Sequence, residues 1–296
     1  MTQDIGTGEV VAVLGIGTMG HGMAASALRA GLATVVWDRN VERTRALEAS
    51  GAEVAPTAAE AAAGAGIVVT LVPDADAVMS VAIDQGMLDA LPRDAIWVQM
   101  STIGVTAIDR VAGIVADRRP DVVLIDAPVS GSKEPAEHGE LTIFASGPDS
   151  ARARVAPLFD ALGHRTVWVG PLGAGSRMKL VNNTLLAFKA EGLAAAVALA
   201  HRLGLDTALL VDALDGGPLL SPWDTAKLQR IADGEYSAQF ALALALKDVH
   251  LALETVDPSR FESFAALARE WERAVEGGLG DEDVTVVTRV LEHGNV

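Results

Sequence analysis

The chain has 296 residues, of which 50% are hydrophobic and 21% charged, a globular composition long enough for two domains. Its 39 acidic and 23 basic residues give a formal net charge of −16, which disfavours nucleic acid and anionic membrane surfaces as partners. The absence of cysteine excludes disulfides, thiolate chemistry and cysteine-bound zinc.

The N-terminal segment 1–9 is polar and acidic and lacks the basic and apolar regions of a signal peptide. No uninterrupted apolar run approaches the roughly 18 residues that cross a bilayer. We therefore expect a cytoplasmic protein with no membrane partner.

Between residue 10 and about residue 126, short β-branched runs alternate with longer helical patterns. This alternation predicts a mostly parallel sheet with helices on both faces. Strands are predicted at 10–14, 34–37, 67–72, 96–100 and 122–126, with 141–146 and 166–169 at the far edge. Helices are predicted at 21–30, 41–50 and 58–65.

The pattern changes after Gly175, where residues 176–203 predict one helix on the order of 40 Å long at 1.5 Å per residue. This helix is apolar on several faces, which predicts burial between domains or against another subunit. Further helices are predicted at 206–214, 223–232, 238–256, 260–276 and 281–293. The expected fold is an α/β, doubly wound Rossmann domain over 1–169, followed by an all-α substrate and dimerisation domain over 170–296.

A glycine-rich segment follows the first predicted strand and leads into a helix. It has the spacing G-x-G-x-x-G and comprises Gly15, Ile16, Gly17, Thr18, Met19 and Gly20. The first glycine permits a tight turn, the second lets the backbone approach a pyrophosphate, and the third lets the helix pack closely. Because strand, glycines, helix and a second strand ending in an acid occur in order, we predict a dinucleotide site rather than a ligand-free turn.

The acid is Asp38, at the end of the second strand, where a carboxylate accepts hydrogen bonds from the adenosine ribose. A carboxylate there repels a 2′-phosphate, whereas the neighbouring Arg39 could bind that phosphate or stack on adenine. We therefore predict NAD as the cofactor, with NADP as the alternative. Val72, at the end of the third strand, is predicted to contact the same cofactor.

Lys179 and Asn183 lie four residues apart near the start of the long helix, so they share one face. The helix macrodipole and burial both disfavour a protonated lysine at this position, which suits the side chain to proton transfer. From composition alone, a surface lysine beside a packed helix is the simpler interpretation.

With these residues the sequence resembles the β-hydroxyacid dehydrogenase family, which includes 3-hydroxyisobutyrate dehydrogenase and is related to 6-phosphogluconate dehydrogenase and the imine reductases. The resemblance covers nearly the whole chain and rests on motifs in the family's order. These are the glycine-rich segment, the D-A-P-V-S-G-S segment at 126–132, the run 170–183, and Lys247-Asp248.

The resemblance implies a role for each motif. Lys179 would be the general acid/base, and Asn183 would hold the substrate's oxygens. Ser130, Gly131 and Ser132 would bind the substrate carboxylate. A base at the reacting oxygen and an anchor beside it suit hydride transfer, because they fix the carbon against the nicotinamide.

On the cofactor side, the resemblance places Ser101 and Thr102 by the nicotinamide and Lys247 over cofactor and substrate. Asp248 is interpreted as a helix-surface charge or as a partner for a neighbouring lysine. Two departures concern the substrate: Ser132 stands where the family usually has a second glycine, and the usual proline after Ser101-Thr102 is missing.

The predicted reaction is reversible NAD(P)-linked oxidation of a small, 3-hydroxyisobutyrate-like β-hydroxyacid to its semialdehyde. The alternatives are an imine reductase, a semialdehyde or glyoxylate reductase on the same fold, and a catalytically silent dinucleotide-binding module. Dedicated imine reductases generally lack a lysine at the position of Lys179. The six histidines show no metal-ligand spacing, so no metal is predicted. The long helix and the resemblance suggest a homodimer.

Overall fold

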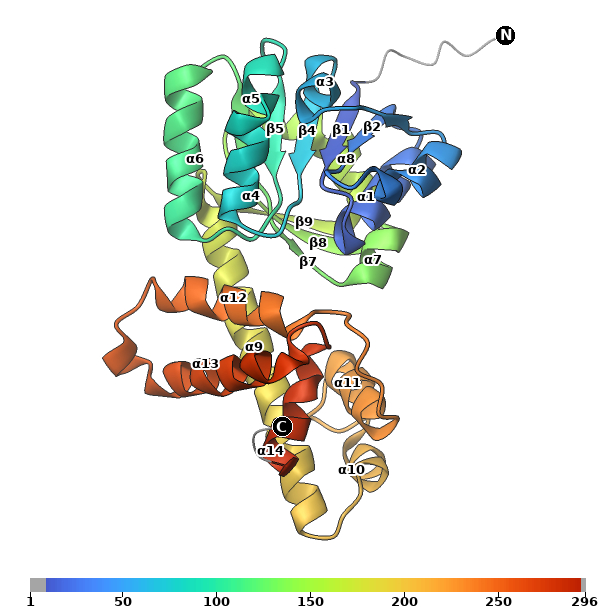
Figure 1. The fold of residues 1–296 in the computed structure, drawn as a ribbon, viewed down its shortest axis with the longest axis vertical. Helices are drawn as coiled ribbons and strands as arrows, with labels where there is room; N and C mark the ends of the chain where they lie inside the picture. Colours follow the sequence, from blue (N-terminus) through green and yellow to red (C-terminus); the bar gives the residue numbers. More distant parts are fainter. Residues whose placement is uncertain (1–8, 294–296) are drawn as a thin grey trace. The chain divides into compact units, whose positions relative to one another are not determined.

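A computed structural model describes residues 9–293, which divide into two compact units between Lys179 and Leu180 (Figure 1). The domain boundary expected after residue 169 is not tested by this division and stays a prediction.

The first unit is built on a nine-stranded sheet with the order β3-β2-β1-β4-β5-β6-β8-β7, and β9 pairs with β8. Neighbouring strands from β3 to β6 are parallel, whereas β8 runs antiparallel to β6 and β7. The strands are β1 (Val11–Leu14), β2 (Thr34–Trp37), β3 (Glu53–Val54), β4 (Ile67–Thr70), β5 (Ile96–Gln99), β6 (Val123–Asp126), β7 (Val129–Ser130), β8 (Leu141–Ser146) and β9 (Gly163–Gly170).

The strand register aligns the carboxyl ends of the central strands in one row. Leu14 is paired with Trp37 and with Thr70, Thr70 with Gln99, and Gln99 with Asp126. The loops that follow these residues therefore leave the sheet along the same edge, which is where open α/β sheets bind their ligands.

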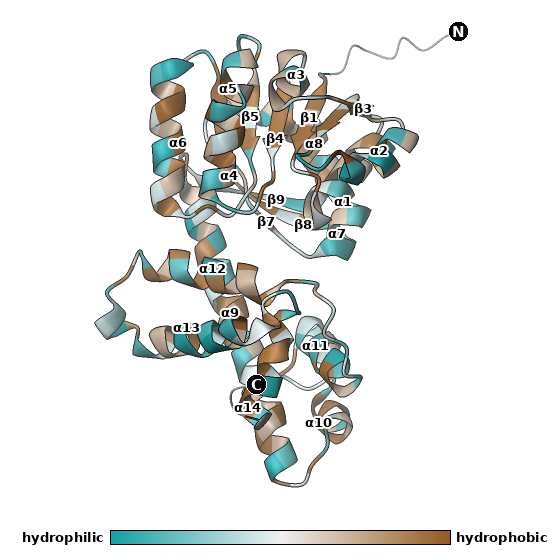
Figure 2. Ribbon diagram, in the orientation of Figure 1, coloured by the Kyte–Doolittle hydropathy of each residue, from teal (hydrophilic) through white to brown (hydrophobic). Residues whose placement is uncertain are grey.

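Helices cover both faces of this sheet, which confirms the doubly wound architecture. In β1, Val11 and Val13 enter the core shared with α1 and α8, whereas Ala12 and Leu14 enter the core on the opposite face. Figure 2 shows the central strands, such as β1 and β4, in the colour of hydrophobic residues. The helices are α1 (Thr18–Arg29), α2 (Arg45–Ala49), α3 (Ala58–Ala63), α4 (Ala75–Met79), α5 (Met87–Ala90), α6 (Val105–Arg118), α7 (Lys133–His138) and α8 (Arg152–Leu162), with a 3₁₀ turn at Val41–Thr44 and a π-helix at Ser80–Asp84.

The described regular elements from Leu180 onward are helices. Helix α9 begins in the first unit and continues into the second, where α10 packs on α11 and α12 on α13. The bounds are α9 (Ala174–Arg202), α10 (Thr207–Leu214), α11 (Pro222–Ala232), α12 (Leu242–Leu253), α13 (Glu262–Ala274) and α14 (Val287–His293).

Helix α9 is long and apolar enough to cross a membrane by length and composition, with a mean hydropathy of 1.3 over its most apolar window. Charged residues, among them Lys179, Lys189 and Glu191, interrupt this helix, so the expectation that no uninterrupted apolar run approaches 18 residues is not contradicted. A single such helix is weak evidence for a membrane segment, because a core helix of a soluble protein meets the same criteria.

Several predicted elements have different bounds in the structure. The first helix starts at Thr18, inside the glycine-rich segment, and the predicted helix 41–50 is a 3₁₀ turn followed by a short α-helix. The predicted helix 238–256 begins only at Leu242. The reason is that the backbone N–H groups of Gln239 and Phe240 donate to the Asp283 carboxylate, which holds this stretch outside the helix.

Candidate functional site

The three motif glycines meet three different local requirements. Gly15 has φ +100°, and a Cβ added there would lie 2.2 Å from the Leu71 carbonyl oxygen. A Cβ on Gly20 would lie 1.9 Å from the Gly15 carbonyl oxygen, so only glycine allows α1 to start so close to the loop. A Cβ on Gly17 would meet no described atom within 4 Å. Packing therefore explains Gly15 and Gly20, whereas Gly17 leaves open space suited to a ligand.

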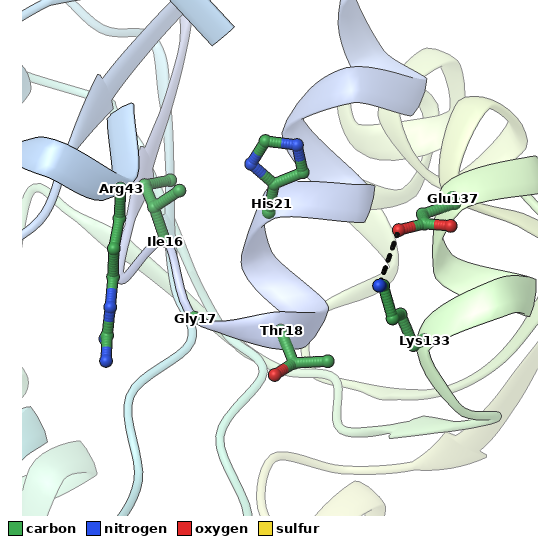
Figure 3. A pocket seen from close by; sticks show the side chains of 7 residues that line it. All are labelled: Ile16, Gly17, Thr18, His21, Arg43, Lys133 and Glu137. Carbon is green, nitrogen blue, oxygen red and sulfur yellow. Dashed lines mark ion pairs between the residues drawn. The ribbon is translucent and has the colours of Figure 1, made fainter. Parts of the chain in front are cut away.

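The open space at Gly17 belongs to a pocket of about 420 Å³ at the start of α1 (Figure 3). Among the described residues, no side chain caps α1 and no acid occupies its first turn, so its amide groups are suited to an anion. Arg43 lies on one side of the pocket, and the Lys133–Glu137 ion pair, at 3.8 Å, lies on the other. The lining residues are Ile16, Gly17, Thr18, His21, Arg43, Lys133 and Glu137.

Asp38 ties the end of β2 to the glycine-rich loop. Its Oδ2 accepts the Ile16 N–H at 2.7 Å, its Oδ1 accepts the Asn40 N–H at 2.8 Å, and the Arg43 guanidinium lies 3.8 Å away. The Ile16 side chain is buried below the loop, whereas Thr18 is exposed in the first turn of α1 and Met19 packs against the core. These contacts hold Asp38 beside the loop.

Ser101 links the ends of β4 and β5. It is buried, and its hydroxyl accepts the Val72 N–H at 2.8 Å and donates to the Thr70 carbonyl at 3.4 Å. Val72 and Thr102 are half-buried. Of the Ser101-Thr102 pair, Thr102 is thus the residue with accessible surface.

The segment predicted to bind a carboxylate follows β6 along the same edge. Ser130 ends β7 and Ser132 precedes α7; both are half-buried. Gly131, between them, is exposed with φ +138°, and a Cβ there would lie 2.6 Å from a methyl group of Leu141. Lys179, the last residue of the first unit, is half-buried.

In the second unit, Asp248 joins two of the predicted site residues. The Asn183 amide, 5% exposed, donates to Asp248 Oδ2 at 2.5 Å, and Lys247 Nζ lies 2.7 Å from Asp248 Oδ1. Asn183 Oδ1 accepts a hydrogen bond from Asn182. The interpretation of Asp248 as a surface charge is therefore wrong, whereas a partner for a neighbouring lysine is correct.

The burial of Asp248 is indicated by the sequence pattern of α12. The buried positions Ala245, Val249 and Ala252 recur at helical spacing in α12, and residue 248 lies on the same face. An acid on a buried helix face needs a polar partner, and its neighbour Lys247 is one. In the part of the chain that the structure describes, no group of three or more His, Asp or Glu side chains is arranged to hold a metal ion.

Comparison with known proteins agrees with this geometry. Residues 10–170 match the family model for the NAD-binding domain of 6-phosphogluconate dehydrogenase. Residues 173–291 match the model for the NAD-binding region of NADP-dependent 3-hydroxyisobutyrate dehydrogenase.

Individual relatives align over nearly the whole chain. Glyoxylate/succinic semialdehyde reductase 1 of Arabidopsis thaliana is 30% identical over 95% of this chain and 98% of its own. The 3-hydroxyisobutyrate dehydrogenase of Pseudomonas aeruginosa is 33% identical over 88% of this chain and 89% of its own. A crystal structure of 3-hydroxyisobutyrate dehydrogenase from Salmonella typhimurium superposes with a TM-score of 0.86, at 29% identity, covering 95% of this chain and 99% of that one.

The chain belongs to the β-hydroxyacid dehydrogenase family, as its sequence motifs predicted. It is an NAD(P)-dependent oxidoreductase, and the open space at Gly17 with the uncapped start of α1 fits the cofactor's diphosphate.

Proposed function

We propose that the protein interconverts a small β-hydroxyacid of the 3-hydroxyisobutyrate type and its semialdehyde. The observation that carries the proposal is that three functional features occur together in the first unit. It contains the open cofactor loop, the accessible segment 130–132 and the half-buried Lys179. An anchor for a carboxylate, a proton-transfer group and a dinucleotide loop are the parts that this reaction requires.

In the proposed mechanism, bound NAD(P) supplies hydride chemistry. Lys179 takes the proton from the substrate hydroxyl during oxidation and returns it during reduction. Ser130, Gly131 and Ser132 hold the carboxylate, which fixes the reacting carbon. Asn183 donates one amide N–H to Asp248, and its second N–H is proposed to donate to a substrate oxygen.

We propose NAD as the preferred cofactor because Asp38 lies at the edge of the loop with both carboxylate oxygens held by backbone N–H groups. A fixed carboxylate can accept from ribose hydroxyls, and it repels a 2′-phosphate. An arginine at this place would by itself attract the 2′-phosphate of NADP. The Arg43 guanidinium lies 3.8 Å from the Asp38 carboxylate, and this negative charge weakens that attraction.

The rival assignments differ in what they predict for Lys179. Imine reductases of known structure share the fold at about 20–22% identity, which shows the fold alone. A catalytically silent dinucleotide-binding module would bind NAD(P) without turning over a substrate, whether or not Lys179 is present. A glyoxylate or semialdehyde reductase would use the same lysine in the opposite direction.

The decisive experiment is oxidation of 3-hydroxyisobutyrate, 3-hydroxypropionate, 4-hydroxybutyrate, glycerate and serine, each with NAD and NADP. Turnover that falls at least about 100-fold in Lys179→Ala, as expected on removal of a general base, supports the proposal. Arg177→Ala is the matched control, since it removes a half-exposed cation two residues earlier on α9. Reduction of a cyclic imine without turnover of any acid would instead support the imine reductase assignment.

We also propose a homodimer formed through α9. Large apolar side chains are exposed near both ends of the α9 segment that follows Lys179: three, spaced four and three residues apart, lie at 181–188, and two, four residues apart, lie at Leu199 and at Leu203 just after the helix. They are Val181 (64% exposed), Leu185 (65%), Phe188 (38%), Leu199 (59%) and Leu203 (68%).

Sedimentation velocity tests this proposal. The wild-type chain should sediment as a dimer and Leu185→Glu with Leu199→Glu as a monomer, because paired helices would bury both charges. Leu219→Glu, at an exposed apolar residue outside α9, is the control. A monomeric wild-type protein at micromolar concentration would contradict the proposal.

A further inference from the structure

The start of helix α9 is held by a buried carboxylate at the end of β6. The Ser176 N–H donates to Asp126 Oδ2 at 2.7 Å, and the Ser176 hydroxyl donates to Asp126 Oδ1 at 2.8 Å. Both residues are at most 3% exposed. Asp126 therefore has no surface for a substrate, although it begins the D-A-P-V-S-G-S motif whose residues 130–132 are expected to bind the substrate carboxylate.

Ser146, the last residue of β8, completes this connection. Its hydroxyl accepts the Gly175 N–H at 2.9 Å and lies 3.0 Å from the Asp126 carbonyl oxygen and 3.2 Å from Oδ2. The first turn of a helix has amide groups without helical acceptors. Here, two of them are bound by side chains from two strands, so the sheet itself caps α9.

The helix also approaches the sheet more closely than a side chain would allow. A Cβ on Gly175 would lie 2.4 Å from the Phe144 carbonyl oxygen and 2.7 Å from that of Asp126. Glycine is unfavourable inside helices, so its presence at this point is explained by the contact. The position and rotation of the α9 start are thus fixed by the sheet.

The same residues connect the two parts of the proposed site in the first unit. Asp126 precedes Ser130 by four residues, and the intervening chain is held by the Phe144 N–H, which donates to the Pro128 carbonyl at 2.9 Å. Ser176 precedes Lys179 by three residues, so the two are neighbours along the helix surface.

Burial raises the pKa of Asp126 above its ordinary value, although hydrogen bonds from Ser176 and Ser146 and the charge of Arg177 oppose this. A buried acid of this kind does not favour the folded state by its charge. Its retention is better explained by the geometry that its oxygens impose on α9.

Resting on the function proposed above, we infer that Asp126 is a positioning residue, which sets the distance between Lys179 and the carboxylate-binding segment 130–132. A misplacement of about 1 Å in a reacting group can cost about 100-fold in rate. The role requires the acceptor oxygens of Asp126 and the absence of a side chain at Gly175.

Two variants disturb this geometry independently. Asp126→Ala removes the acceptors, and Gly175→Ala inserts a methyl group between helix and sheet while favouring helix formation. For each, we expect kcat to fall about 10- to 100-fold while the Kd for NADH, from fluorescence titration, stays within about twofold. Asp126→Asn keeps an oxygen that can accept the Ser176 N–H. Its kcat should therefore be at least about tenfold higher than that of Asp126→Ala.

The control is Asp109→Asn, on α6, which breaks the exposed ion pair with Arg177 at 3.2 Å. Arg177 follows Ser176 in the first turns of α9, and the kcat of this variant should stay within about twofold of the wild-type value. All assays are run well below the measured Tm of each variant. If folded Asp126→Ala and Gly175→Ala keep wild-type kcat, or if they lose kcat and NADH binding equally, the inference is wrong. An active Lys179→Ala would refute the proposed function instead.

Discussion

Replacing Asp283 should destabilise the second unit more than any surface substitution. Asp283 is fully buried, and its two oxygens lie 2.8 and 2.9 Å from Lys227 Nζ. It also accepts the backbone N–H groups of Gln239 and Phe240 and the hydroxyl of Thr285. One carboxylate thus holds α11, the chain entering α12 and the chain entering α14.

The magnitude follows from what the substitution leaves behind. In Asp283→Ala, the Lys227 ammonium, with a side chain only 4% exposed, loses its ion-pair partner inside the protein. Breaking one side of a buried pair costs about 3–5 kcal/mol, a large part of the roughly 5–15 kcal/mol that stabilises a typical domain. The double variant with Lys227→Met should recover more than half of this loss, because no buried charge remains.

Equilibrium urea unfolding followed by circular dichroism measures these differences. Glu282→Gln is the control next in sequence: it breaks the half-exposed pair with Arg289 at 3.0 Å and should cost about 0–1 kcal/mol. A loss below about 1 kcal/mol in Asp283→Ala, or no recovery in the double variant, would refute the assignment of Asp283 as a buried junction.

The pH dependence gives an independent check. Burial alone would raise the pKa of Asp283, but the hydrogen bond and charge of Lys227 bring it below its ordinary value of 3.8. A carboxyl with a lowered pKa stabilises the folded state above the unfolded-state pKa, and this contribution is lost as the pH falls through the folded-state pKa. The stability difference between wild type and Asp283→Asn should therefore be constant near neutrality and shrink below about pH 4.

Three further predictions concern the site. Gly17→Ala should keep the wild-type Tm in thermal scans, but fluorescence titration should show at least about tenfold weaker NADH binding, because the new methyl group enters the space left for the ligand. Gly20→Ala should instead lower the Tm, because its methyl group would collide with the Gly15 carbonyl oxygen. Asp248→Leu should lower kcat/KM about tenfold by releasing Asn183, measured by steady-state oxidation, and unchanged kinetics would contradict the proposed role of Asn183. Asp38→Ser should shift the ratio of kcat/KM for NAD over NADP at least about tenfold towards NADP, and an unchanged ratio would show that Asp38 does not select the cofactor.

The sequence predicted the parts of the fold that depend on local pattern. The strands at 34–37 and 141–146 match the structure residue for residue, and the long helix is displaced by only two residues at its start. These elements have apolar or β-branched runs bounded by turns, which are the strongest local signals of secondary structure. Helix α6 was not predicted, although its buried residues Ile108, Val111 and Val115 recur at helical spacing.

What the sequence does not show is which distant segments its buried acids connect. Asp126, Asp248 and Asp283 each lie at most 4% exposed, and their partners are 50, 65 and 56 residues away. Polarity alone predicts an exposed position for an aspartate, because most occur at surfaces. The distant donors that make this burial tolerable are brought to the acids only by the tertiary structure. The sequence motifs predicted Lys179 and Asn183 as functional residues. The positions of these two side chains depend on buried acids, Asp126 for Lys179 and Asp248 for Asn183.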